Sequence, residues 1–160
     1  MYIGMFIAED DEKILPYLEL LRNSIYEYAT IELFEDAARA SSGSSYVDFK
    51  RQVLKFTAAA QEYISTNLVG GAVTTYNTDC IFYAYVLAGA PSFYISSDDG
   101  ATWSLIASGS QKIHNPALPF TATSTWRIKA VATTSDDMIS TFGLIYSRKA
   151  KFRIVIDEQS

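Results

Sequence analysis

Residues 96–103 read Ser-Ser-Asp-Asp-Gly-Ala-Thr-Trp, and this stretch decides the predicted fold. Asp and Ser side chains form hydrogen bonds with their own backbone in turns, and Gly100 can adopt a positive φ without a steric penalty. The flanking residues 93–95 (Phe-Tyr-Ile) and 103–106 (Trp-Ser-Leu-Ile) have the composition of β-strands. The stretch therefore predicts the turn of a β-hairpin.

The same stretch fits the pattern Ser-x-Asp-x-Gly-x-Thr-Trp, which resembles the Asp-box, a hairpin turn that recurs in carbohydrate-handling proteins and virion surface proteins. The resemblance implies that the turn is built by Ser96, Asp98, Gly100, Thr102 and Trp103. It assigns no enzymatic activity, because in this pattern the aspartate organises the turn and lies away from any catalytic site.

The composition argues against several classes of protein. The 160 residues suffice for one domain or two small modules, and hydrophobic residues make up 49% of them. A net charge of −5 argues against a general nucleic-acid binder, and no apolar run reaches the roughly 18 residues that span a bilayer. Cys80 is the only cysteine, which excludes an internal disulfide and favours a reducing compartment such as the cytoplasm.

The two halves of the chain differ in pattern and in charge. Residues 1–69 contain 11 acidic and 6 basic residues, a net −5, whereas residues 70–160 contain 7 of each. The glycine pair at 70–71 ends the helix-like pattern of the first half. We therefore predict an α+β chain, in which a helical oligomerisation or attachment segment (1–69) precedes an antiparallel β-sandwich or jelly roll (70–160).

Apolar residues in the first half recur at alternating steps of three and four positions. Any helix in a bundle shows an apolar stripe, but a strict two-in-seven stripe is typical of a coiled coil. Aromatic side chains in such a seam need room, which favours a trimer over a dimer. The predicted oligomer seam consists of Ile14, Leu18, Leu21, Ile25, Tyr46, Phe49, Val53, Phe56 and Tyr63.

The second half contains about eight short strand-like segments separated by residues with turn chemistry. In one of these segments Ile128 and Ala130 alternate with Arg127 and Lys129. This period of two places the apolar pair on the buried face and the basic pair on the other face.

Catalytic chemistry is sparse in this sequence. His114 is the only histidine, and no Gly-x-Ser-x-Gly elbow is present. The acidic pairs at 98–99 and 136–137 are best explained as turn formers, with calcium binding and catalysis as weaker readings. A sialidase-type propeller repeats the Asp-box in each blade and needs at least four blades. This chain has one such motif, and its β-rich half of about 90 residues is too short for four blades. We therefore expect no enzyme, no metal site and no cofactor.

Candidate ligand contacts are aromatic and basic. Tyr94 and Trp126 could stack on sugars, although tryptophans at strand positions are also expected to be buried. Arg148 belongs to a basic cluster at 148–153 that could contact an acidic glycan or could simply be a solvated edge.

Three segments together resemble the C-terminal modules of tailed-bacteriophage appendage proteins, that is, tail fibres, baseplate proteins and head fibres. They are residues 94–103 (YISSDDGATW), 126–130 (WRIKA) and 139–146 (ISTFGLIY), and the resemblance covers residues 91–147. It implies a virion structural component, commonly a homotrimer, with one end attached to the particle and the other facing the host. The short chain lacks a repeat-rich shaft, which favours a decoration, adaptor or baseplate piece.

Our first hypothesis is thus a structural component of a phage virion that is assembled in the host cytoplasm. Its expected partners are sister copies, other virion proteins and a host-surface glycan, with no nucleic acid and no membrane. The alternative is a stand-alone carbohydrate-binding module that presents exposed aromatic residues such as Tyr94, Trp103 and Trp126. A hydrolase is the third reading, and the single histidine and single turn motif argue against it.

Overall fold

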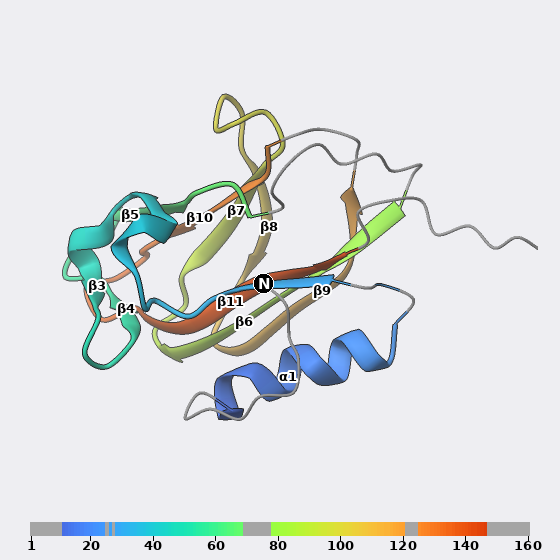
Figure 1. Ribbon diagram of the computed structural model, residues 1–160. Helices are drawn as coiled ribbons and strands as arrows, with labels where there is room; N and C mark the ends of the chain where they lie inside the picture. Colours follow the sequence, from blue (N-terminus) through green and yellow to red (C-terminus); the bar gives the residue numbers. More distant parts are fainter. Residues whose placement is uncertain (1–10, 25, 27, 69–77, 121–124, 147–160) are drawn as a thin grey trace, which may run out of the picture.

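The computed structural model describes residues 11–24, 26, 28–68, 78–120 and 125–146. These residues form two antiparallel β-sheets packed face to face, with one α-helix on the outer surface of one sheet (Figure 1). Strands make up 51% of these described residues. No helix in this part of the chain is long and apolar enough to cross a membrane.

The larger sheet, sheet A, has the order β3-β4-β11-β6-β9, with β1 also paired to β11. Its strands are β1 (Tyr28–Glu32), β3 (Val47–Asp48), β4 (Val53–Lys55), β6 (Thr78–Ala88), β9 (Gln111–Phe120) and β11 (Met138–Tyr146). The smaller sheet, sheet B, has the order β2-β5-β10-β7-β8. Its strands are β2 (Ala40–Ser42), β5 (Glu62–Ser65), β7 (Ser92–Ser96), β8 (Ser104–Ser108) and β10 (Arg127–Val131).

The remaining elements are α1 (Asp11–Arg22) and the short 3₁₀ helices η1 (Ala37–Arg39) and η2 (Ser44–Tyr46). Because β1 and β4 pair with β11, and β5 pairs with β10, residues from both halves of the sequence contribute strands to both sheets.

The core between the sheets is rich in aromatic rings. Phe142 of β11 lies 5.8 Å from Phe34, 6.1 Å from Tyr63 and 6.0 Å from Phe93, measured between ring centroids. All four side chains are almost completely buried, and burial of each such side chain stabilises the fold by about 1.5–3 kcal/mol. The sandwich is therefore held together mainly by this apolar centre.

The helix α1 covers part of the outer face of sheet A (Figure 1). Tyr17 is fully buried there, and its hydroxyl lies 2.9 Å from Thr141 Oγ1 and 3.1 Å from the carbonyl oxygen of Tyr83. A Cβ atom at Gly143 would lie 2.9 Å from Tyr17 Cε1 and 2.5 Å from the carbonyl oxygen of Thr30. The missing side chain at Gly143 thus lets α1 approach the sheet.

The predicted helical, coiled-coil N-terminal half is wrong. Within the described residues, α1 is the only helix of more than one turn, and the chain is mostly β. Ile14 is buried against sheet A, and Leu18 and Leu21 pack beside it. This apolar stripe is therefore used within the chain and does not form the predicted seam. Ile25 lies outside the described residues.

The second predicted seam segment is not helical. Val53 and Tyr63 lie in β4 and β5. Tyr63 and Phe56 belong to the sandwich core, whereas Val53 is buried outside that cluster. Tyr46 ends η2 and packs on Phe56, whereas Phe49 is exposed in the turn after β3. Short strands separated by turns can place inward-facing residues three or four positions apart, which imitates helical spacing.

Candidate functional site

The stretch 96–103 forms the turn between β7 and β8, and Ser96 is its centre. The backbone N–H of Gly100 donates to Ser96 Oγ over 2.8 Å, and the Ser96 hydroxyl donates to Asp98 Oδ1 over 2.7 Å. Asp99 and Gly100 both adopt positive φ, at 61° and 90°. Gly100 adopts this conformation without strain, whereas a residue with a Cβ atom adopts it less easily.

Asp98 fixes the second half of the turn. Its carboxylate accepts hydrogen bonds from the Thr102 hydroxyl at 2.6 Å and from the Thr102 backbone N–H at 2.8 Å. The bond from the Thr102 hydroxyl, followed by the bond from Ser96, lowers the pKa of Asp98 to about 2. The carboxylate is therefore ionised at neutral pH and is committed to the turn, which suits a structural role.

An ion pair ties the tip of the turn to the neighbouring strand β10. Arg127 reaches Asp99 Oδ1 with Nε at 2.7 Å and with Nη2 at 2.6 Å. The other nitrogen, Nη1, donates to the carbonyl oxygen of Ser65 in β5 over 3.4 Å. The hairpin tip is thus held against sheet B through one arginine.

Lys129 of β10 lies between two aromatic rings on the outer surface of sheet B. Its Nζ is 4.7 Å from the ring centroid of Trp103 and 5.3 Å from that of Tyr94. The same Nζ lies 3.6 Å from Glu62 Oε2. The Lys129 side chain is only 16% exposed, so the cation–π contacts are partly desolvated and help to fix both rings.

The strand register extends this surface in a row across the sheet. Lys129 faces Ile64 on one side and Tyr94 on the other, and Tyr94 faces Leu105, which is 59% exposed. We call this surface the aromatic face; it comprises Glu62, Tyr94, Trp103, Leu105 and Lys129. It presents two half-buried rings and a paired charge to solvent.

The other predicted ligand contacts do not join the aromatic face. Trp126 is 2% exposed and belongs to the core, so its predicted contact with a ligand is wrong. Arg148 lies outside the described residues. Of the predicted aromatic residues, Tyr94 and Trp103 are thus the two that the fold brings together at the surface.

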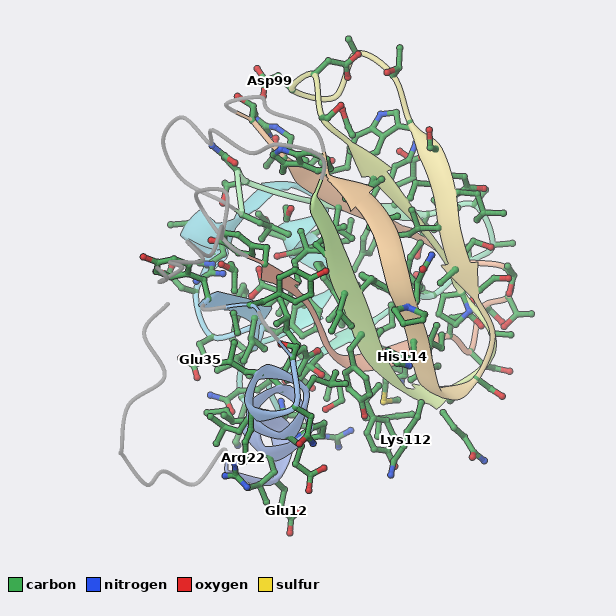
Figure 2. The ribbon with its side chains drawn as sticks, turned by 90° about the vertical axis from the view of Figure 1, so that its right-hand side faces the viewer. Glu12, Arg22, Glu35, Asp99, Lys112 and His114 are labelled. Carbon is green, nitrogen blue, oxygen red and sulfur yellow. The ribbon has the colours of Figure 1, made fainter. Side chains whose placement is uncertain are left out.

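The described residues bring no catalytic acid–base pair together. His114 is exposed on β9, and Figure 2 shows it well below Asp99, which lies at the top of the view. The Asp137 side chain accepts hydrogen bonds from Thr133 and Thr134; although burial raises its pKa, these bonds lower it below the usual value. No group of three or more metal-ligating side chains occurs in this part of the chain.

Sequence analysis missed the buried Glu32. This side chain is 1% exposed; Tyr63 donates to its Oε2 over 2.8 Å, and the Phe34 backbone N–H donates to its Oε1 over 2.9 Å. Arg39 Nε lies 3.9 Å from Oε2. Burial raises the pKa of Glu32, and the hydrogen bonds offset part of that rise. The available signal was a lone acidic residue between Ile31 and Leu33, in an otherwise apolar run.

The sequence matches no protein-family description and no curated protein. Among solved structures, a GH29 fucosidase of Ruminococcus gnavus in complex with fucose matches with a TM-score of 0.41 and 13% identity, over 79% of this chain and 27% of that one. A family GH115 4-O-methyl-α-glucuronidase with specificity for decorated arabinogalactans gives a TM-score of 0.40 and 12% identity, over 69% of this chain and 17% of that one.

A chitosan-binding module from a chitosanase/glucanase of Paenibacillus sp. IK-5 gives a TM-score of 0.36 and 16% identity, over 76% of this chain and 96% of that one. The chain thus spans about a sixth to a quarter of the length of the two glycosidases. At TM-scores this low the likeness carries no argument about function, which must come from the aromatic face itself.

Proposed function

We propose that this protein binds a carbohydrate on the aromatic face of sheet B. The observation that carries the proposal is the pair of rings, Tyr94 and Trp103, fixed on either side of Lys129 at the surface. The electron-rich face of an aromatic ring attracts the partly positive C–H groups of a sugar ring, while sugar hydroxyls need polar partners. Glu62 and Lys129 supply such partners beside the rings.

The support around the rings favours binding by a preformed surface. The hydrogen bonds of Asp98 fix the turn that carries Trp103, and the Asp99–Arg127 ion pair fixes the tip of that turn on β10. A surface that is ordered before binding loses little side-chain entropy when the ligand arrives. A turn held in one conformation by these hydrogen bonds and this ion pair suits a binding module better than a catalytic site that has to change shape.

We further propose that binding occurs without turnover. The carboxylates of Asp98 and Asp137 accept several hydrogen bonds within their own turns, and His114 lies on β9 of sheet A rather than on sheet B. A glycosidase needs two carboxyl groups facing each other across the sugar at about 5–10 Å. Glu62 is the carboxylate of the aromatic face, and it is paired with Lys129.

The virion role is the weaker candidate. It depends on the resemblance of residues 91–147 to phage appendage modules, and the coiled-coil stem that supported it is absent from the described residues. Host-surface glycan binding by a virion protein would use the same aromatic face. Localisation in a particle therefore remains a prediction, separate from the binding proposal.

A glycan array probed with the full chain is the first test, followed by calorimetry on the strongest binder. Trp103→Ala and Tyr94→Ala should each weaken binding about tenfold, which corresponds to ~1.4 kcal/mol. Phe49→Ala is the matched control, because Phe49 is an exposed ring (39%) in a turn of the other sheet. No bound glycan on the array, or an unchanged affinity in folded Trp103→Ala, would overturn the proposal.

A further inference from the structure

A cavity lies on the other sheet, between α1 and the outer face of sheet A. Its volume is about 240 Å³, which is below the range of pockets for drug-sized ligands and suits a single ring. Its walls are formed by Glu12, Lys13, Pro16, Tyr83, Tyr85, Leu87, Ser140 and Thr141. We call it the helix cavity; it shares no residue with the aromatic face.

The walls of the helix cavity divide into an apolar side and a hydroxyl side. Pro16, Tyr85 and Leu87 provide apolar surface, and Tyr85 and Leu87 are 38% and 49% exposed. Tyr83, Ser140 and Thr141 provide hydroxyl groups and are all buried. A ligand that fits this division has one apolar ring and a polar group at one end.

The hydroxyl of Tyr83, in the wall of the helix cavity, is buried without a hydrogen-bond partner among the residues that the structure describes. The side chain is 6% exposed, and its oxygen has no hydrogen-bond partner in the described part of the chain. A buried hydroxyl without a partner costs free energy, and a native protein that retains one calls for a reason. A ligand atom that forms this bond would supply it.

The position and protonation of Tyr83 suit a hydrogen-bond donor. Its ring packs edge-on against Tyr17, with the centroids 5.0 Å apart and an interplanar angle of 82°. Burial, followed by the neighbouring Tyr85 and Glu19, raises the pKa of Tyr83, so the hydroxyl keeps its proton at neutral pH. The free hydroxyl is covered, and we expect the half-exposed Tyr85 ring to move slightly when a ligand enters.

The charges around the helix cavity favour a neutral ligand. Glu12 and Lys13 have opposite signs, and Lys13 Nζ donates to the Gln52 carbonyl oxygen over 2.5 Å. Figure 2 shows Glu12 at the surface, at one end of α1. A charged ligand would meet a like charge as well as a counter-charge, and Lys13 is already bonded to a carbonyl oxygen, so the lining favours neither sign.

We propose that the helix cavity binds a neutral single-ring molecule with one hydroxyl group, such as a phenol. The ring lies against Pro16, Tyr85 and Leu87, and the ligand oxygen accepts a hydrogen bond from Tyr83. A free sugar fits less well, because its further hydroxyls would face the apolar wall without partners. The site is independent of carbohydrate binding on sheet B.

The test uses ¹⁵N-labelled full chain titrated with phenol, and with toluene as a probe of similar shape that lacks the hydroxyl. Phenol should cause saturable amide shifts confined to the first turn of α1, to β6 and to residues 140–141. It should bind about fivefold or more tightly than toluene, as one hydrogen bond predicts. In Tyr83→Phe this preference should disappear, whereas Leu105→Ser on the opposite sheet should keep it.

Leu87→Lys is a second variant, chosen because Leu87 is half exposed and its replacement leaves the core untouched. It should abolish phenol binding while the spectrum elsewhere stays unchanged. Shifts that do not saturate, shifts spread over the surface, or a phenol preference that survives Tyr83→Phe would each overturn the proposal.

Discussion

The hydroxyl of Tyr63 donates a hydrogen bond of 2.8 Å to Glu32 Oε2 in a part of the sandwich where both side chains are only 1% exposed. The bond joins β5 of sheet B to the end of β1 in sheet A. The carboxyl group at this junction is buried, and burial raises its pKa above the usual 4.5. This has a direct consequence for stability.

We expect the stabilising contribution of Glu32 to the free energy of unfolding to decrease as pH rises above 4.5. Because the native pKa is raised, the native state binds more protons than the unfolded state between 4.5 and the native value. The contribution is therefore complete below 4.5 and is lost as pH rises through the native pKa. Thermal unfolding of Glu32→Gln between pH 4 and 8 should show a flatter dependence than the wild type. Equal slopes in the two proteins would contradict this.

Asp98 should act in the opposite direction. Its pKa is lowered from 3.8 to about 2 by the hydrogen bonds from Thr102 and Ser96, so its stabilising effect is present above 3.8 and is lost as pH falls towards 2. Asp98→Asn should lose less stability than the wild type over this acid range. Tm measured from pH 2 to 5 provides the comparison, with Asp136→Asn, an exposed neighbour of another turn, as the control.

The two tyrosines packed edge-on under α1 should respond oppositely to loss of the hydroxyl. Tyr17→Phe removes a buried hydrogen bond to Thr141 and should destabilise the fold by about 1–2 kcal/mol. Tyr83→Phe removes a buried hydroxyl without a partner in the described residues and should stabilise the free protein by about 1 kcal/mol. Urea unfolding measures both, and a destabilised Tyr83→Phe would show that this hydroxyl is bonded in solution.

Gly143→Ala should destabilise the fold by about 1–3 kcal/mol, because the added Cβ would overlap the Thr30 carbonyl oxygen of β1 at 2.5 Å and crowd Tyr17 of α1 at 2.9 Å. Ser110→Ala, at an exposed position, is the control and should change the unfolding free energy by less than about 0.5 kcal/mol. Chemical denaturation distinguishes the two. A wild-type midpoint for Gly143→Ala would mean that β1 and α1 do not pack closely on β11 at this position.

Asp99→Ala should weaken glycan binding by a few fold although Asp99 is outside the aromatic face. The variant releases Arg127 from the hairpin tip, so the turn that carries Trp103 becomes less ordered before binding. The indole N–H signal of Trp103 in a ¹⁵N spectrum should broaden or move in the free protein. A reduced affinity with an unmoved indole signal would indicate direct contact of Asp99 with the ligand.

The sequence was informative where the interactions are local. The hydrogen bonds of the β7–β8 turn join residues two to four positions apart, so the residue types alone indicate the turn. The alternation in β10 likewise predicts which side chains face the core, and Ile128 and Ala130 are fully buried as expected. Both signals depend on neighbours in the chain.

The pairing of strands that are far apart in the chain could not be predicted from the sequence. β1 pairs with β11 across more than a hundred residues, for example Tyr28 with Tyr146, and nothing in residues 28–32 names that partner. Without the partner, the apolar spacing of the first half was read as helical. The contact of Lys129 with Trp103 also depends on the order of β10, β7 and β8 in the sheet, which the local pattern does not contain.

The pairings of β5 with β10 and of β1 and β4 with β11 also limit how the protein can be divided. A fragment that starts after residue 69 would keep β10 and β11 but would leave an unpaired backbone edge on each, next to an uncovered aromatic interior. Such edges readily join those of other molecules and lead to aggregation. The acidic first half thus supplies the strands that cover the edges of β10 and β11. We expect either part, expressed alone, to expose backbone edges and apolar surface that are buried in the intact protein.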